Sequence, residues 1–379
     1  MRIRLAFAIV ALLSTVALRA QSITRPPSGE NQHATVSQNI GLVKITIDYN
    51  SPKVHNPFTK EDRRGKIWGT LVPYGPQKTL GYGTCTECPW RVGANENTTF
   101  TTSHDIQIEG QTLKAGAYGM HIIPDPDTWT VIFSNDSTNW GSFFYEPSHD
   151  ALRVKAKPEK SEYHEWLTFD FTERQPDHAT VAMKWEDLAL PLKITVPNIN
   201  EYYLAQMRNE LKNAAGFDWQ NFNAAAQFAL TNKIVPKDAL QWAQTAAGSG
   251  FPGQENFTTL RTLADAQEAN GMSADAVKTR DRAMNHPTAT AVQLHMYGRQ
   301  LQQQGKKEQA LAVYELNAKR HPNEWPVNVG LARGYSAAGR FKDALKYAKL
   351  AEAQAPDDTN KKNLQQGIAK LEQGKDMNQ

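Results

Sequence analysis

Residues 291–324 read AVQLHMYGRQLQQQGKKEQALAVYELNAKRHPNE, and their pattern of small residues also occurs on both sides of this stretch. One glycine and one alanine recur every 34 residues: Gly271, Gly305, Gly339, Ala276, Ala310 and Ala344. A period of this length indicates stacked helix hairpins, because one helix pair cannot bury its own apolar face and must lean on the next. The sequence therefore predicts a helical repeat array in this part of the chain.

The repeat units are expected at 257–290, 291–324 and 325–358, with a closing helix at 360–373. A more degenerate helix pair precedes them at 219–230 and 237–247, and a first helix precedes that pair. Proline and glycine residues fall where helices should start or end. The helical domain is therefore predicted to span residues 198–379.

This pattern resembles the tetratricopeptide repeat family over about 120 residues. Small, bulky and terminating positions of two units match the family: Gly298, Gly305, Ala310, Tyr314, Pro322, Gly339, Ala344 and Pro356. The large aromatic residue that often opens the family's repeat is absent, and Leu294 and Asn328 stand there instead. The resemblance implies a surface for a protein or peptide partner without identifying that partner.

Residues 36–197 show the alternation of strands instead. In the segment 43–49 apolar side chains alternate with polar ones, which is typical of a strand with one buried face. Similar runs follow, with turn-forming residues between them: 106–108, 129–133, 152–156, 167–171, 181–185 and 188–196. Eight or nine strands without a helix between them favour an antiparallel sandwich or barrel, so the whole chain is predicted as a two-domain α+β protein.

The strand-rich domain resembles a bacterial family known as domain of unknown function 2911. Several ordered segments carry the resemblance: residues 40–42 (IGL), Tyr49, Ser51-Pro52, 64–69 (RGKIWG), 71–75 (LVPYG), 90–96 (WRVGANE), 114–119 (KAGAYG), 129–133 (WTVIF), 139–141 (NWG), 150–154 (DALRV) and Trp185-Glu186. Members of this family resemble secreted or periplasmic proteins, and the family name implies no activity.

The N-terminus has the features of a secretory signal. Arg2 and Arg4 precede an uncharged run at 5–18, which is too short to cross a bilayer comfortably. We expect residues 1–20 to be removed, 21–35 to be a flexible segment, and the mature protein to be periplasmic or secreted from a bacterium. The alternative is a permanent N-terminal anchor. No later stretch is long and apolar enough to be a transmembrane span.

The charge balance argues against a nucleic-acid partner. The chain has 42 Lys and Arg against 39 Asp and Glu, and loss of Arg2, Arg4 and Arg19 with the signal leaves 39 against 39. Without a net positive field, the main electrostatic contribution to nucleic-acid affinity is missing. A local basic cluster is interpreted as a solvated loop: Lys60, Arg63, Arg64 and Lys66.

The two cysteines, Cys85 and Cys88, lie in a Gly-rich excursion at 76–89. In an exported protein a structural disulfide is the expected state. A redox-active pair would need a lowered thiol pKa, and a structural zinc would need about two further ligands. Covalent haem attachment is excluded because Pro89, and not histidine, follows the pair.

Polar residues that could form a site gather at Arg91, Asn95 and Glu96, with His121 on a neighbouring predicted strand. Arginine could bind a carboxylate or sugar hydroxyls, and Glu96 or His121 could act as an acid or base. The alternative is structural: Arg91 and Glu96 pair with each other, or with Asp150 and Arg153, to lock strand ends.

Aromatic residues offer a second possibility, since exposed Trp90 or Trp140 rings would stack on a sugar, whereas buried ones would form core. Trp68 and Trp129 present the same choice. No metal site is expected because the histidines lack metal-ligand spacing, and no cofactor motif or common catalytic motif occurs.

Two functions remain open. The first is an exported, non-enzymatic binding or scaffold protein whose repeat array holds a protein or peptide. The second is a hydrolase or carbohydrate-active protein with a site near Arg91, Asn95, Glu96 and His121, which would bind a carbohydrate or other small molecule. The sequence favours the first.

Overall fold

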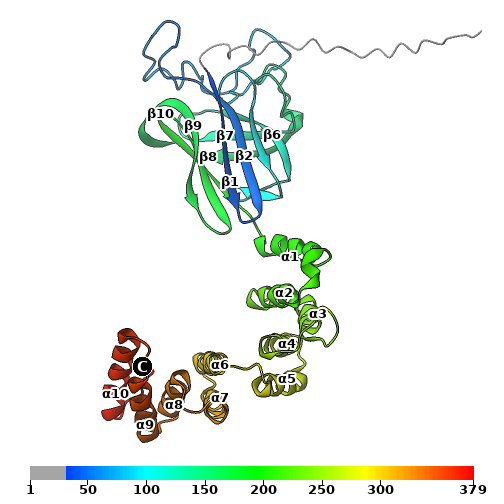
Figure 1. Cartoon of the computed structure of the whole chain (residues 1–379). Helices are drawn as coiled ribbons and strands as arrows, with labels where there is room; N and C mark the ends of the chain where they lie inside the picture. The colour runs from blue at the N-terminus through cyan, green and yellow to red at the C-terminus, as the bar shows by residue number, and fades with distance from the viewer. Residues whose placement is uncertain (1–30) are drawn as a thin grey trace, which may run out of the picture. The chain divides into compact units, whose positions relative to one another are not determined.

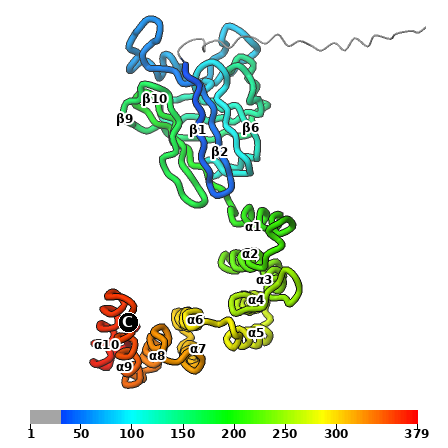
Figure 2. The backbone as a smooth tube through the Cα atoms, in the orientation of Figure 1, coloured from blue at the N-terminus to red at the C-terminus, as the bar shows by residue number. Residues whose placement is uncertain are grey.

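The computed structural model describes residues 31–379, which form two compact units meeting in sequence at Ile199 and Asn200. The first unit is made of strands and the second of helices (Figure 1, Figure 2). The predicted signal segment, residues 1–20, lies outside the described residues.

The strands of the first unit are β1 (Gln32–Ile40), β2 (Val43–Ser51), β3 (Thr98–Thr102), β4 (Ile106–Ile108), β5 (Gln111–Leu113), β6 (Gly116–Ile123), β7 (Trp129–Ser134), β8 (Asp150–Ala156), β9 (Glu159–Arg174) and β10 (His178–Thr195). They hydrogen-bond into a six-stranded sheet, β1-β2-β3-β6-β7-β8, and a four-stranded sheet, β5-β4-β10-β9. All these pairings are antiparallel, which confirms the predicted strand class.

Strand β2 shows why these residues form sheet. Val43, Ile45 and Ile47 are fully buried, whereas Lys44 between them is exposed. Successive side chains of a strand point to opposite faces, so this alternation buries one face and leaves the other open to water. The predicted strand at 43–49 is confirmed.

Two predicted boundaries differ from the structure. Strand β1 begins at Gln32, inside the segment expected to be flexible, because residues 32–40 pair in register with β2. The runs at 181–185 and 188–196, expected as separate strands, belong to the single strand β10. The pairing of β10 with β9 shifts at Glu186, whose φ is 57°, so a bulge interrupts the alternation without ending the strand.

Four tryptophans pack together in the first unit. The ring centroid of Trp68 lies 5.7 Å from those of Trp90 and Trp185 and 4.7 Å from that of Trp129. Trp129 and Trp185 are fully buried, so this cluster is core, as one of the two alternatives predicted. Trp140 is different, because 55% of it is exposed.

The helices of the second unit are α1 (Ile199–Glu210), α2 (Trp219–Thr231), α3 (Pro236–Ala247), α4 (Phe257–Ala269), α5 (Ser273–Asn285), α6 (Ala291–Gln303), α7 (Lys307–Arg320), α8 (Trp325–Ala337), α9 (Phe341–Ala353) and α10 (Asp358–Glu372). Helices α4, α6 and α8 start at residues 257, 291 and 325, as predicted. Within each repeat the two helices pack against each other, which confirms the hairpin array.

The recurring glycines end the first helix of each pair. Gly271, Gly305 and Gly339 have φ between 74° and 78°, a left-handed conformation that favours glycine. The residue after each glycine donates its N–H to a carbonyl five residues back, as in a Schellman motif: Met272 to Gln267, Lys306 to Leu301 and Arg340 to Tyr335. The recurring alanines are buried where the two helices of a pair meet.

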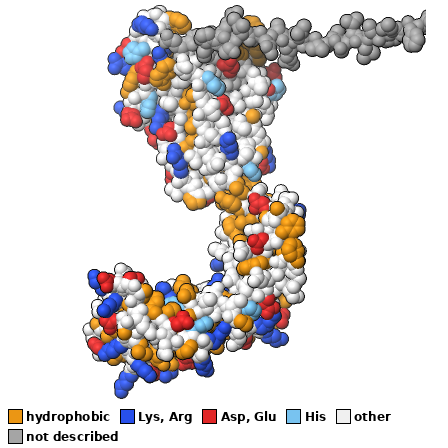
Figure 3. All heavy atoms as spheres, viewed as in Figure 1, with side chains coloured by type: hydrophobic (Ala, Val, Ile, Leu, Met, Phe, Trp, Pro, Cys, Tyr) orange, Lys and Arg blue, Asp and Glu red, His pale blue; other side chains and the backbone are white. Residues whose placement is uncertain are grey.

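Charges on the visible face of the molecule are mixed. Figure 3 shows Lys and Arg side chains interspersed with Asp and Glu over both units. Within residues 31–379, no helix is both long enough and apolar enough to span a membrane.

Candidate functional site

Three of the predicted site residues meet at the surface of the first unit. Asn95, Glu96 and Trp140 line an open hollow of about 440 Å³, together with Asn50 and Asp48. The Glu96 carboxylate accepts a hydrogen bond from Asn50 Nδ2 at 2.9 Å. An exposed carboxylate held this way can accept further hydrogen bonds, and the exposed Trp140 ring adds apolar surface.

Arg91 is not among the residues lining this hollow. Its Nη1 donates to the carbonyl of Asn95 at 2.6 Å, and its guanidinium lies 5.0 Å from the centroid of the Phe143 ring. A side chain at Gly141 would collide with this guanidinium, so glycine leaves the room that Arg91 fills. Burial lowers the pKa of Arg91. The arginine therefore positions the loop that carries Asn95.

The predicted ion pairs of Arg91 and Glu96 do not form. In the part of the chain that the structure describes, neither residue makes a salt bridge, and Asp150 binds its own neighbours Arg153 and Tyr145. The structural alternative, in which Arg91 and Glu96 pair with each other or with Asp150 and Arg153, is therefore wrong about which residues pair.

His121 is buried within the six-stranded sheet, with 1% of it exposed. One ring nitrogen, Nδ1, lies 3.0 Å from Ser142 Oγ. Burial, together with the positive charge of Arg91, lowers the pKa of His121 to about 4, so the imidazole is neutral at pH 7. His121 does not line the hollow that holds Glu96, so the two candidate acid–base residues lie in different surroundings.

Trp90 also lies away from the hollow. Its ring stacks on Trp185 at a centroid distance of 5.9 Å, inside the tryptophan core. The four residues of the predicted hydrolase site, Arg91, Asn95, Glu96 and His121, thus do not share one cavity. The prediction grouped these residues because they are close in the sequence or lie on strands that were expected to be neighbours.

Cys85 and Cys88 are joined by a disulfide, which was the expected state of this pair. Both residues are buried against Ile132 and Tyr145. Neither cysteine is a free thiol among residues 31–379. It closes a small ring within the excursion at 76–89, and the packing of both cysteines on Ile132 holds that ring against strand β7.

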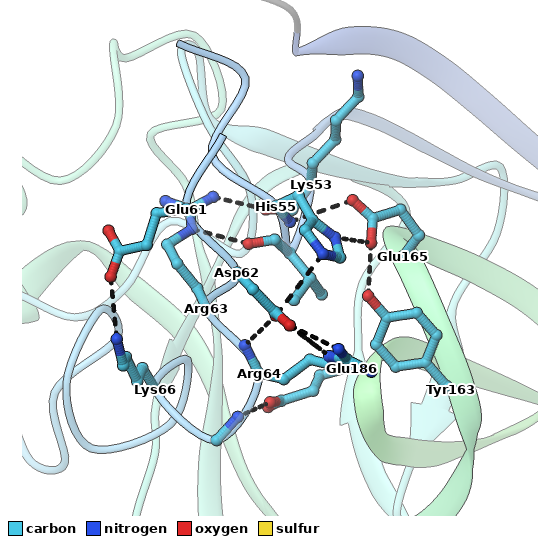
Figure 4. A network of polar contacts seen from close by, with 12 residues as sticks. Lys53, His55, Glu61, Asp62, Arg63, Arg64, Lys66, Tyr163, Glu165 and Glu186 are labelled. Atoms are coloured by element: carbon cyan, nitrogen blue, oxygen red, sulfur yellow. Dashed lines mark hydrogen bonds and ion pairs between the residues drawn. The ribbon is translucent and has the colours of Figure 1, made fainter. Parts of the chain in front are cut away.

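A polar network that sequence reasoning missed joins the loop after β2 to strand β9 (Figure 4). His55 Nδ1 lies 2.8 Å from Glu165 Oε2, and the Tyr163 hydroxyl donates to the same carboxylate at 2.5 Å. Arg64 donates to both oxygens of Asp62, and these contacts lower the pKa of Asp62 to about 2. The basic side chains of this loop are largely exposed, as expected for a solvated loop, with Arg64 62% and Lys66 59% exposed.

Glu186 anchors this loop from the opposite strand. Its carboxylate accepts a hydrogen bond from the N–H of Gly65, and burial raises its pKa. Glu186 and Gly65 line a hollow of about 260 Å³ with Trp68 and Tyr163. Residues 64–69 and Trp185-Glu186, two of the segments that carry the family resemblance, meet here. The family pattern was thus the only signal in the sequence for this contact.

The second unit carries a groove lined by the first helices of successive pairs. Two hollows of about 430 and 120 Å³ share Arg299 of α6 and Arg333 of α8. Because these arginines are 34 residues apart, they occupy the same position in successive repeats and lie in a row. We call this surface the basic groove and define it by His295, Arg299, Lys307, Trp325, Arg333 and Asn363.

The basic groove contains buried polar atoms without partners. Arg333 Nε, Trp325 Nε1 and His295 Nδ1 have no hydrogen-bond partner within residues 31–379. Burial and the charge of Arg299 lower the pKa of Arg333, and burial with the charges of both arginines lowers the pKa of His295 to about 4. Arg333 Nε and Trp325 Nε1 are donors, and an unpaired buried donor costs free energy, so a ligand that accepts hydrogen bonds from them gains affinity.

No group of three or more His, Cys, Asp or Glu side chains suited to a metal ion occurs in the described ranges. The arrangement of the basic groove suits an anionic or carbonyl-rich ligand instead, because cations and N–H donors line it.

Part of the chain matches a known family model. Residues 31–194 match the family model described as "Protein of unknown function (DUF2911)", which confirms the resemblance expected from the sequence. No curated protein matches the chain.

Solved structures of TPR proteins are similar to part of the chain. A thermophilic TPR protein of Thermus thermophilus, TTC0263, is 18% identical, covering 46% of this chain and 91% of that one, with a TM-score of 0.31. YrrB, described as a TPR protein with an unusual peptide-binding site, is 16% identical over 44% of this chain and 84% of its own, with a TM-score of 0.29. MamA is 17% identical, with shares of 41% and 88% and a TM-score of 0.28.

Proposed function

We propose that this chain, a DUF2911 domain followed by a helical repeat array, is a non-enzymatic binding scaffold whose basic groove holds an acidic peptide segment of a partner protein. The observation that carries the proposal is the row of Arg299 and Arg333 beside three buried, unpartnered polar atoms. Within residues 31–379 no carboxylate forms an ion pair with either arginine. Arg299 is thus open to an anionic ligand, whereas Arg333 also feels the charge of Asp376, which lines the same hollow.

The chemistry of the groove selects among ligands. Peptide carbonyls can accept hydrogen bonds from Trp325 Nε1 and Arg333 Nε, and a carboxylate can pair with the arginines. Val329 and Leu364 add apolar surface in the smaller hollow, where an apolar side chain can be buried. A peptide supplies all three kinds of group at once.

Removing the two charges should weaken binding. We expect Arg299→Gln with Arg333→Gln to reduce affinity for Asp- or Glu-containing peptides by about 100-fold or more, since a hydrogen bond to a charged group contributes about 1.5–3 kcal/mol and two such groups are removed. An array of eight-residue peptides with random sequences, probed with the full chain, measures this loss. The matched control is Lys342→Gln with Lys349→Gln on α9, which removes the same charge from exposed positions.

The control variant should select the same acidic peptides as the unmodified chain. Equal loss in both double variants would mean that only net charge matters, and the groove would then have no role. Selection of peptides without acidic residues by the unmodified chain would also contradict the proposal.

We further propose that the protein works outside the bacterial cytoplasm. The signal-like features of residues 1–20 and the disulfide between Cys85 and Cys88 support this location, since disulfides persist in oxidising compartments. Cell fractionation of a strain that expresses the full chain tests it. A variant with Leu12→Arg and Leu13→Arg should stay in the cytoplasm, and export of that variant would contradict the signal assignment.

A further inference from the structure

The residues after α10 occupy part of the basic groove. We call residues Asp376–Gln379 the tail; Asp376, Asn378 and Gln379 line the larger hollow and Met377 lines the smaller one. The tail is not helical, and it starts after a left-handed glycine, Gly374, that ends α10 as the recurring glycines end other first helices. Where an earlier repeat would begin its second helix, the chain instead lies against α8.

Side chains of α8 hold the tail by specific hydrogen bonds. Ser336 Oγ donates to Asp376 Oδ1 at 2.6 Å and accepts from the N–H of Met377 at 2.9 Å. Asn378 Nδ2 donates to the carbonyl of Arg333 at 3.1 Å, and its Oδ1 accepts from Arg333 Nη1 at 3.3 Å. Ser336 thus binds the carboxylate of Asp376 and the backbone N–H of Met377, and Arg333 binds the side-chain amide of Asn378.

Met377 fills an apolar position between these polar contacts. Its side chain packs with the buried clusters around Val329 and Leu364. A Cβ at Gly367 of α10 would lie 2.7 Å from Met377 Cε, so the absence of a side chain there makes room for the methionine. The site is therefore shaped for an apolar side chain that follows an acidic residue.

The tail leaves the groove incompletely satisfied. Arg333 Nε, His295 Nδ1 and Trp325 Nε1 remain without partners among residues 31–379 although the tail is bound, and Arg299 and Lys307 receive no ion pair from it. A segment fixed there only as a structural cap would gain from pairing these groups. The bound tail instead resembles a minimal occupant of a site that can make more contacts.

We propose that the tail is an internal competitor, and that the ligand of the basic groove is a peptide segment with an acidic, an apolar and an amide side chain in that order, which displaces Asp376–Asn378. This inference rests on the proposed function and specifies its ligand. The tail is attached to α10, so its effective concentration at the groove is on the order of millimolar. Competition with the tail therefore lowers the apparent affinity of the groove for a free peptide.

The test uses a fluorescein-labelled peptide with the sequence of residues 373–379, QGKDMNQ, and a scrambled peptide of the same composition. Fluorescence anisotropy measures their binding to the full chain, to a chain lacking 376–379, and to full-length Met377→Ser. We expect the shortened chain to bind the labelled peptide about 10- to 100-fold more tightly than the full chain. Met377→Ser should fall between them, and the scrambled peptide should bind none.

Lys375→Ala is the matched control, because this side chain is exposed and its hydrogen bond goes to Gln373 rather than to the groove. It should bind like the full chain. Circular dichroism at 222 nm checks that the shortened chain keeps its helices. If the shortened chain loses them, the comparison of full-length Met377→Ser with the unmodified chain tests the proposal instead. Equal affinity of the full and tail-altered chains would overturn the proposal, as would a tail-dependent dimer of the full chain in sedimentation, which would make a second copy the occupant.

The two proposals can fail separately. If acidic peptides from the array bind through Arg299 and Arg333 but the tail peptide does not bind the shortened chain, the internal competitor is wrong and the groove function stands. If no array peptide binds any variant, the groove function itself is wrong.

Discussion

Replacing Tyr314 by alanine is expected to lower the free energy of unfolding of the helical unit by about 3–5 kcal/mol, the range for deleting a buried aromatic side chain. Tyr314 lies on α7 and is fully buried at the centre of the repeat array. Its loss opens a cavity between α6, α7 and α8 that these helices cannot close without moving apart. Urea unfolding followed at 222 nm, where helices dominate the signal, measures the change.

Three glycines make the slot in which the Tyr314 ring lies. A Cβ at Gly298 of α6 would come within 2.4 Å of the ring, and Cβ atoms at Gly330 and Gly334 of α8 would come within 2.6 and 2.7 Å. Alanine is normally better than glycine inside a helix by about 0.5–1 kcal/mol. Here the sign should reverse, because the added methyl group collides with a ring that has no free space.

A double-mutant cycle separates these effects. Gly298→Ala alone should destabilise the helical unit by about 1–3 kcal/mol. In the Tyr314→Ala background the same change should stabilise it, since the collision is gone and the helix preference remains. A stabilising Gly298→Ala in the presence of Tyr314 would show that the slot is not rigid.

Lowering the pH from 7 to 4.5 should destabilise both units through two buried histidines. His121 in the first unit and His295 in the second have pKa values of about 4 in the folded chain, against an ordinary value of 6.5. Between these values the unfolded chain binds a proton that the folded chain does not, so stability falls as the pH falls through this window. Each histidine should contribute a loss of about 2–3 kcal/mol by pH 4.5.

Single variants separate the contribution of each histidine to the pH dependence of stability from that of the carboxylates, which titrate in the same pH range. His121→Gln should reduce the pH dependence of the first unit, followed by hydrogen exchange of its strand amides, and leave that of the helical signal unchanged. His295→Gln should do the reverse. The charges that face these rings are Arg91 and Asp136 for His121, and Arg299 and Arg333 for His295. A pH dependence identical to that of the unmodified chain in both variants would contradict the assignment.

Local patterns explain how much of the fold could be predicted. The left-handed turn at Gly305 and the small contact at Ala310 depend on neighbours within one hairpin, so the 34-residue spacing reports them directly. The alternation in β2 likewise depends on one strand and its two faces. Where the pattern was broken, as at the Glu186 bulge, the strand boundary was wrong.

The candidate sites were less predictable. Arg91 and Glu96 lie in the loop before β3 and His121 lies on β6, where the pleat turns its side chain inward, whereas the loop leaves Glu96 at the surface. Conversely, Gly65 and Glu186 are far apart in sequence and meet through one hydrogen bond. Composition and spacing carry no information on such long-range contacts, because these contacts depend on how whole sheets pack.

By itself, the amino-acid sequence determined the two kinds of architecture, the start of each repeat and the family of the first unit, because these follow from short-range preferences repeated many times. Only the tertiary structure decided that Arg299 and Arg333 share a groove, and that Asp376–Asn378 lie in it. A turn at Gly374 returns the chain to α8, and the free energy of that contact comes from groups that no local pattern brings together.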